Sequence, residues 1–300
     1  MIKSLKFRRG LTDALIYILL IVLSVIWLSP IVWLVLQSFA GEGIAARAKF
    51  VPSTWTFNNY LMLFSNFTGL VNPDPNIAHS MDGLFSTWFL NTLIVAVLNC
   101  IISTLFVLLT SYALSRFRFK ARGIFMKMNL ILGMFPGFLS MIIMYWVMKE
   151  IFHLQGSYWS LVILYSAGSG AGFYICKGFF DTISKSIDEA AMIDGATRNQ
   201  IFWSIILPLA KPIVVYTILT SFMSPWGDYI TSSYIIGLQN PTNWTVAIGL
   251  YQMLSANDLV MAYYTQFAAG AVCVALPTTL LFIFLQKYYV SGVTGGAVKG

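Results

Sequence analysis

Asp228 is the acidic residue best placed for chemistry inside the membrane, because it lies in an otherwise apolar run at Pro225-Trp226-Gly227-Asp228-Tyr229. A charge at membrane depth is costly, so such a residue usually faces a cavity or a partner. Two interpretations are open. In the first, Trp226, Asp228 and Tyr229 line a translocation path, where the carboxylate accepts hydroxyl donors and an aromatic face stacks on the solute. In the second, the carboxylate lies at the outer interface or caps a helix that Pro225 breaks.

Other candidates for catalysis or metal binding are few. His79 and His153 fall in polar loops far apart in the sequence, with no Cys or carboxylate at ligand spacing. The glycine-rich stretch at 168–172 lacks the Gly-Lys-Ser/Thr ending of a phosphate-binding loop. We therefore expect no catalytic residue, no metal site and no cofactor in this chain, and any ATP would be bound by a partner.

The segment 186–212 is polar and carries helix-capping signals on both sides of Gly195. In a capping box, a Ser or Thr is followed three residues later by Glu or Gln, and each side chain bonds the other's backbone amide. The two pairs at this spacing are Ser186 with Glu189 and Thr197 with Gln200. Gly195 lies where a left-handed residue would end the first helix. Two short helices joined by a tight turn are therefore expected, with Pro208 before the next apolar run.

This capped pair of helices would suit either a membrane surface or a partner protein. The first expected helix, 187–194, carries acidic residues and no basic one, so anionic headgroups would repel it. The second has apolar residues spaced to form one face, which can anchor the pair to the membrane-spanning helices. These residues are Ile201, Phe202, Ile205 and Ile206. The pattern favours protein docking.

The same segment resembles the EAA loop of ABC-importer permease subunits. The matching residues are Glu189-Ala190-Ala191, Asp194-Gly195-Ala196, Phe202, Ile205, Leu207-Pro208 and Pro212. Two further stretches, 91–99 and 284–300, resemble the carbohydrate-uptake branch of that family, relatives of the smaller maltose permease subunit. The resemblance covers roughly residues 10–300. It departs from the branch at Gly227, where Asn is typical, which weakens the transfer of a role to that position.

The resemblance implies a type I ABC importer fold in a bacterial cytoplasmic (inner) membrane. It implies that the loop is a coupling helix entering a groove on an ATPase subunit, with Glu189 and Asp194 facing the groove. Ala190 and Ala191 would allow close contact, Gly195 would make the turn, and Ala196 completes the matching motif. Implied partners are a second permease subunit, two ATPase subunits that bind ATP and Mg, and an external solute-binding protein.

The implied cargo is a sugar or oligosaccharide, and two alternatives are open. One is an ABC importer permease for another solute. The other is an ion-coupled secondary transporter, which would need ion-binding carboxylates at mid-membrane, where this chain offers Asp228. The sequence does not identify the sugar.

Composition places the chain in the membrane. Of its 300 residues 58% are hydrophobic and 10% are charged, against about 25% charged in soluble domains. The 18 basic residues outnumber the 11 acidic ones, but they form no stripe on a soluble face, so nucleic acid is not an expected partner. Six apolar runs are long enough to cross a bilayer as helices, for which about 20 residues suffice. They lie at about 14–39, 88–114, 124–148, 157–176, 212–236 and 261–286.

Basic residues predict the orientation of these six spans. With the N-terminus inside, three of the basic residues, Arg47, Lys49 and Lys149, fall outside. The others fall inside, and they are Lys3, Lys6, Arg8, Arg9, Arg116, Arg118, Lys120, Arg122, Lys127, Lys177, Lys185, Arg198, Lys211, Lys287 and Lys299. Because cytoplasmic loops are enriched in Lys and Arg, both termini are expected inside and the loop 186–212 between spans four and five is cytoplasmic.

We therefore predict an all-α integral membrane protein in three parts. Residues 1–87 form a tail, the first transmembrane helix and an external loop. Residues 88–290 form the permease core with its EAA loop at 186–212, and residues 291–300 form a cytoplasmic C-terminal tail.

Overall fold

The computed structural model describes residues 2–64, 83–168, 170–255 and 257–297, and His79 lies outside them. Helices dominate these residues, and the β-structure among them is one isolated bridge between Ala40 and Trp55. The α-helices are α1 Ile2–Ser38, α2 Asn58–Phe64, α3 Phe85–Arg116, α4 Arg122–Gly133, α5 Gly137–Trp146, α6 Tyr158–Ala167, α7 Gly170–Thr182, α8 Lys185–Ile193, α9 Arg198–Gln200, α10 Leu207–Leu209, α11 Lys211–Gly227, α12 Tyr229–Ile236, α13 Val246–Gln252 and α14 Asn257–Ala297. Shorter or wider turns of helix lie at Gly43–Ala48, Val147–Ile151, Ile201–Ile206 and Pro241–Asn243.

Two units make up the fold, and the first comprises residues 1–83 and 252–273. In it, a polar loop folds back on the end of α1. The Glu42 carboxylate accepts hydrogen bonds from the backbone amides of Ser53 (2.7 Å) and Thr54 (2.9 Å), and Lys49 lies 3.4 Å away. These donors lower the pKa of Glu42 to about 2. The loop is therefore an ordered polar structure, held by this carboxylate and by bonds from Trp33 and Gln37 of α1 to Lys49 O.

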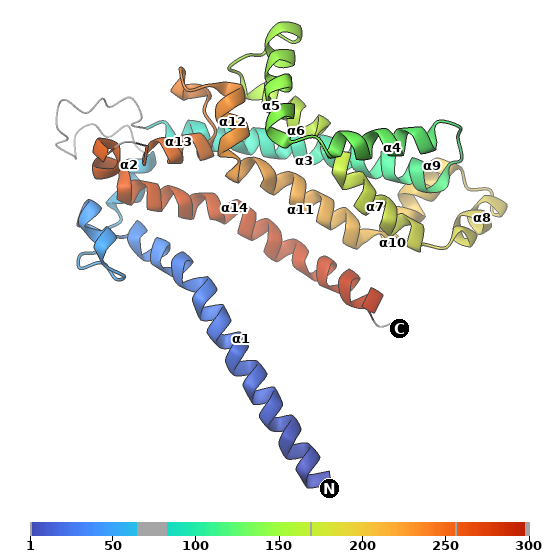
Figure 1. Ribbon diagram of the computed structural model, residues 1–300, viewed down its shortest axis with the longest axis horizontal. Coiled ribbons are helices and arrows are strands. Elements are labelled where there is room, and N and C mark those ends of the chain that lie inside the picture. The colour runs from blue at the N-terminus through green and yellow to red at the C-terminus, as the bar shows by residue number, and fades with distance from the viewer. Residues whose placement is uncertain (1, 65–82, 169, 256, 298–300) are drawn as a thin grey trace. The chain divides into compact units, whose positions relative to one another are not determined.

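The second unit comprises residues 84–251 and 274–300, and α3 is its central helix. Helices α6, α7 and α11 pack along α3, and α12 contacts α5 and α6 (Figure 1). Polar side chains on α3 bond backbone atoms of neighbouring segments: Asn91 Nδ2 donates to Thr242 O (2.9 Å), and Ser111 Oγ to Phe173 O (3.0 Å). Burying these groups is tolerated because each has a partner. Short α8 and α9 lie together at one end of this unit (Figure 1).

Four described helices are long and apolar enough to cross a membrane, at Gly10–Ser38, Phe85–Arg116, Tyr158–Thr182 and Leu259–Tyr288. Two bent helix pairs raise the number of candidate spans to six if each pair counts as one. All-helical architecture with four to six candidate spans agrees with the prediction.

The first of the two bent pairs breaks inside the expected span 124–148, and the second, Arg198–Leu209 with Lys211–Gly227, breaks just ahead of the expected span 212–236. The pair Arg122–Gly133 and Gly137–Ile151 bends by 101° where Pro136 precedes α5. Proline fixes its φ and disfavours helix at the residue before it, which explains the break. In the other run, Pro225 is tolerated inside α11, the helix ends at Gly227, and α12 begins after Asp228.

Candidate functional site

Helix α8 is the first half of the predicted docking segment, and Ser184 begins it. The Ser184 Oγ accepts from the backbone amide of Ser186 (3.3 Å), and Ser186 itself lies within the helix. The capping box predicted between Ser186 and Glu189 is therefore wrong. The helix starts at Lys185, two residues earlier than predicted, and so contains one basic residue.

The turn after α8 has the left-handed glycine that the sequence predicted. Gly195 has φ +83° and its amide donates to Met192 O (3.1 Å), while the amide of Ala196 donates to Ala191 O (2.9 Å). These two bonds together form a Schellman motif, which satisfies carbonyls at the end of a helix. The direction of the chain at this turn is therefore fixed by backbone bonds.

The second half starts with a capping box and continues into the core. Thr197 Oγ1 accepts from the Gln200 amide (3.3 Å), and the Gln200 side chain accepts from the Thr197 amide (2.8 Å). Phe202 is buried against Tyr112 of α3, with ring centroids 4.7 Å apart. Pro208 lies in α10, directly before an 84° bend into α11. The residues expected to form an apolar anchoring face, Ile201, Phe202, Ile205 and Ile206, all pack in or against one hydrophobic cluster.

The two sides of α8 differ in what they expose. Glu189, Ala190, Asp194 and Gly195 are exposed, as docking requires. Ala191 is 8% exposed and belongs to the hydrophobic cluster, so its side chain faces the chain's own core and is closed to a partner. Its expected contact with a partner is thus corrected.

Ile193 is the most exposed large apolar residue of the docking segment, at 87%, and the sequence interpretation missed it. It is the last residue of α8, directly before the turn. An isoleucine at that place in a polar loop, next to the motif, was the available signal.

A buried ion pair between α3 and α8 also escaped the sequence analysis. Arg116 Nε lies 2.9 Å from Asp188 Oδ2, with side-chain exposures of 5% and 13%, and Arg116 Nη2 donates to Ile183 O (3.0 Å). Burial raises the pKa of the Asp188 carboxyl, and the guanidinium of Arg116 opposes that shift. Removing one partner of such a pair leaves a buried charge without compensation. The pair therefore ties the docking helix to the central helix.

Asp228 lies between α11 and α12 and caps α12. Its Oδ1 accepts from the Thr231 amide (2.9 Å), and its Oδ2 accepts from the hydroxyl of Tyr165 in α6 (2.8 Å). Tyr229 stacks on Tyr251, with centroids 3.9 Å apart. Trp226 is 4% exposed and packs against Phe89. The structure thus makes Asp228 a helix cap with a hydroxyl partner.

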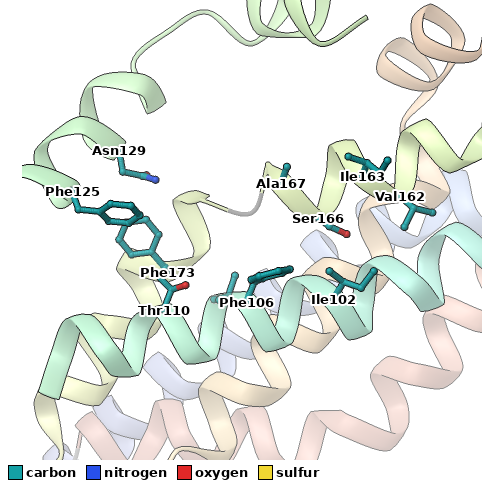
Figure 2. Close-up of a pocket in the computed structure, with 11 residues that line it drawn as sticks. Ile102, Phe106, Thr110, Phe125, Asn129, Val162, Ile163, Ser166, Ala167 and Phe173 are labelled. Atoms are coloured by element: carbon teal, nitrogen blue, oxygen red, sulfur yellow. The ribbon is translucent and has the colours of Figure 1, made fainter. Parts of the chain in front are cut away.

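The second unit contains several hollows, and the two described next lie among its longer helices. One, of about 470 Å³, is a mostly apolar groove lined from α3, α4, α6 and α7, with Phe125 and Phe173 at one end and Val162 and Ile163 at the other (Figure 2). The other, of about 780 Å³, is lined by hydroxyl and amide side chains as well as apolar ones, and includes both Tyr165 and Thr231. The second hollow therefore borders the Asp228 cap.

Several apolar helices long enough to cross a membrane, a polar cavity between helices and an exposed, capped helix pair together indicate a transport permease. The chain belongs to the family of binding-protein-dependent transport system inner membrane components, whose family model matches residues 107–295. Membership places the chain in the inner membrane, as part of a transport system that works with a solute-binding protein.

Similar proteins of full length agree with this assignment. The chain is 35% identical to the galactooligosaccharides transport system permease protein GanQ of Bacillus subtilis, covering 100% of both chains. It is 37% identical to the maltodextrin transport system permease protein MalD of Streptococcus pneumoniae, covering 99% of both. An ion-coupled secondary transporter finds no support among these relatives.

A solved structure shares the fold. It is described as a bacterial ABC transporter involved in the import of the acidic polysaccharide alginate. The TM-score is 0.72 at 23% identity, over 93% of this chain and 97% of that one.

Proposed function

We propose that this chain is the permease subunit of an ATP-driven importer that moves a sugar or oligosaccharide across the bacterial inner membrane. Support comes from the full-length relatives, which are named for galactooligosaccharides and maltodextrin and align over the whole chain. A cargo of another class has no comparable support here.

The proposed assembly contains this chain, a second permease subunit, two ATPase subunits and an external solute-binding protein. ATP and Mg would be bound by the ATPase subunits, and this chain would hold no cofactor. We propose six spans with both termini inside, with the bent pair 122–151 as the third span and α11 with α12 as the fifth, because that orientation leaves three basic residues outside. The division at residues 87 and 290 belongs to the same proposal.

The proposed coupling role rests on which side chains of α8 are exposed. Its exposed side presents Glu189, Ala190, Ile193 and Asp194, while its other side is fixed by Arg116 and the core. An exposed apolar residue ringed by polar ones is the pattern of a small protein-binding surface. We propose that this exposed side enters a groove on the ATPase subunit, so that closure of the ATPases moves α8 and changes access to the cavity.

Site-directed cross-linking tests this role. In a variant with Cys100, Cys176 and Cys273 replaced by Ser, Ile193→Cys should cross-link to an ATPase subunit in membranes, because its side chain is 87% exposed. The matched control is Leu238→Cys, 46% exposed in the loop proposed to lie outside. It should react with a membrane-impermeant thiol reagent in intact cells and give no ATPase cross-link. The opposite labelling pattern would overturn the proposed orientation and the coupling role together.

A further inference from the structure

The mostly apolar groove of the second unit runs along α3, between α4, α6 and α7 (Figure 2). Its lining on α3 extends from Ile102 to Thr110, which is about 12 Å of helix. Spread over that length, its volume of about 470 Å³ leaves a cross-section of about 40 Å². A helix with its side chains is about 10–12 Å across and fills roughly twice that area or more. The groove is therefore too narrow for another helix but has room for an extended hydrocarbon chain.

Its depth along α3 places this groove in one leaflet of the bilayer. In the orientation proposed above, Arg116 at the end of α3 marks the cytoplasmic surface. At about 1.5 Å per residue, Thr110 lies about 9 Å from that end and Ile102 about 21 Å from it. The hydrocarbon core is about 30 Å thick, so the groove runs through the inner leaflet to about the middle of the membrane.

The segment that follows α3 is strongly basic. Between Phe117 and Asn129 it holds four basic residues and no acidic one: Arg118, Lys120, Arg122 and Lys127. Three of these are exposed, and Arg122 is half-buried. Arg122 lies three residues before Phe125 of the groove lining, and residues at that spacing are neighbours on a helix. The basic charges therefore lie at the end of the groove that holds Phe125.

Asp181 of α7 lies close enough to interact with Arg122 but does not cancel the charge of this segment. Its carboxylate is held by Lys177 Nζ (2.5 Å) and by Ser115 Oγ (2.6 Å). One acidic residue thus stands against five basic ones, and a net positive charge is left for an anion.

Lipid suits this surface better than a second protein does. Lys is depleted in protein–protein interfaces, and the groove is narrower than a helix. Between its basic residues, α4 also exposes Ile124 (63%) and Met128 (56%), and basic residues beside exposed apolar ones are typical of segments at a membrane surface. Basic pockets between membrane helices on the cytoplasmic side bind anionic headgroups.

We infer that the groove and the basic segment 118–127 together form a binding site for an anionic phospholipid of the inner leaflet. An acyl chain lies in the groove, and the phosphate lies against the basic side chains. This inference goes beyond the proposed transport function and depends only on its proposed orientation.

Native mass spectrometry of the purified importer, titrated with phosphatidylglycerol or with phosphatidylcholine of the same acyl chains, tests the site. We expect phosphatidylglycerol to bind at least tenfold more tightly. The triple variant Arg118→Gln, Lys120→Gln, Lys127→Gln should weaken this binding about 100-fold, because each basic residue near an anionic headgroup contributes about fivefold. All three side chains are exposed, so folding should be unaffected.

A charge-matched control is the triple variant Lys185→Gln, Lys211→Gln, Lys287→Gln. These residues are exposed and lie outside both the groove lining and the basic segment, so phosphatidylglycerol binding should change less than about twofold.

A second pair of variants tests the groove itself. Ala167→Trp fills it and should weaken phosphatidylglycerol binding at least tenfold, because displaced methylenes lose their apolar contacts. Leu109→Trp adds the same ring on exposed α3 surface outside the lining, and should leave binding unchanged.

Equal affinity for the two lipids, an unaffected basic triple variant, or equal losses in a variant and its control would overturn the inference. A cross-link from Ala167→Cys to a second permease subunit would show that protein covers the groove, and would overturn it too. These outcomes leave the labelling of Leu238→Cys and ATP-dependent uptake unchanged. Failure of the lipid site is therefore distinguishable from failure of the proposed orientation or function.

Discussion

Two carboxylates at helix junctions of the same unit are satisfied in different ways. Asp188, on the docking helix, faces the guanidinium of Arg116 at 2.9 Å. Asp228, between α11 and α12, faces neutral donors, the Thr231 amide and the Tyr165 hydroxyl. One junction is held by opposite charges and the other by hydrogen bonds alone.

This difference affects how firmly each junction is held. A buried ion pair fixes geometry because either charge without the other is strongly unfavourable. The docking helix is therefore tied to α3 by a contact that does not tolerate loosening. A cationic partner for Asp228 would place a positive charge beside the polar cavity. The partners it has, an amide and a hydroxyl, are neutral. The following changes test whether charge matters at the first site and only hydrogen bonding at the second.

The largest effect is expected from Asp188→Asn. It leaves Arg116 buried without a counter-charge, and should lower the free energy of unfolding by about 3–5 kcal/mol. Thermal unfolding of the purified importer would measure the loss, and ATP hydrolysis should become uncoupled from uptake. Replacing both partners, Arg116→Met with Asp188→Leu, should restore most of the stability, because no charge is then stranded. A single variant as stable as the unmodified chain would show that the pair contributes nothing.

A smaller effect is expected from the same type of change at Asp228. Asp228→Ala removes the cap of α12 and should cost about 1 kcal/mol. Asp228→Asn keeps an acceptor for the Thr231 amide, and should stay within about 0.5 kcal/mol of the unmodified chain, since Asn caps helices as well as Asp does. Thermal unfolding again gives the comparison. If the Asn variant lost as much as the Ala variant, the charge itself would matter and the contrast with Asp188 would fail.

Gly195→Ala tests the contribution of the turn after α8 separately from that of the ion pair between Arg116 and Asp188. Gly195 has φ +83° and open space around the position of a Cβ. Gly195→Ala should therefore lower the free energy of unfolding by about 1 kcal/mol, because Ala disfavours the left-handed backbone but meets no clash there. Gly178 in α7 also has open space and lacks a positive φ, so Gly178→Ala should stabilise, by up to about 1 kcal/mol. Thermal unfolding of each variant, compared with that of the unmodified chain, would measure these two effects. Equal effects would show that the turn geometry is not what constrains this position.

A third carboxylate, Glu42, extends the comparison to a partly buried site with backbone donors. Its folded pKa of about 2 is depressed from 4.5, so its contribution is complete above pH 4.5 and is lost as the pH falls towards 2. Hydrogen-exchange protection of the Ser53 and Thr54 amides, corrected for intrinsic rates, should fall across that window. Glu42→Gln should reduce protection at neutral pH. Unchanged protection in that variant would remove the role assigned to the carboxylate.

Local signals predicted the docking segment well where the interaction is local in sequence. The Gly195 turn and the Thr197–Gln200 box involve residues at most five positions apart, so their spacing carried the information. Ser184 and Ser186 were confused because both are serines at the start of one helix. The choice between them depends on where α7 ends and on the Arg116 bond to Ile183 O, which spacing does not reveal.

Contacts between residues far apart in the chain could not be predicted from the sequence. Arg116 was counted as one of many basic residues, and nothing in its neighbourhood indicates that it faces Asp188. Asp228 was recognised as unusual, but its cap and its bond to Tyr165 required the packing of α6 against α12. Apolar runs predicted the four helices that are long enough to cross a membrane, while hydropathy alone does not give the 101° bend at Pro136.

The contact between Phe202 and Tyr112 roots the docking segment in the protein interior. A load applied at Ile193 reaches α3 through packed rings and a salt link, with no slack linker in between. Because close-packed interiors resist compression, such a load tilts whole helices before it deforms them. If an ATPase subunit moves the docking segment, as proposed, the segment would therefore pass that motion to α3 with little loss.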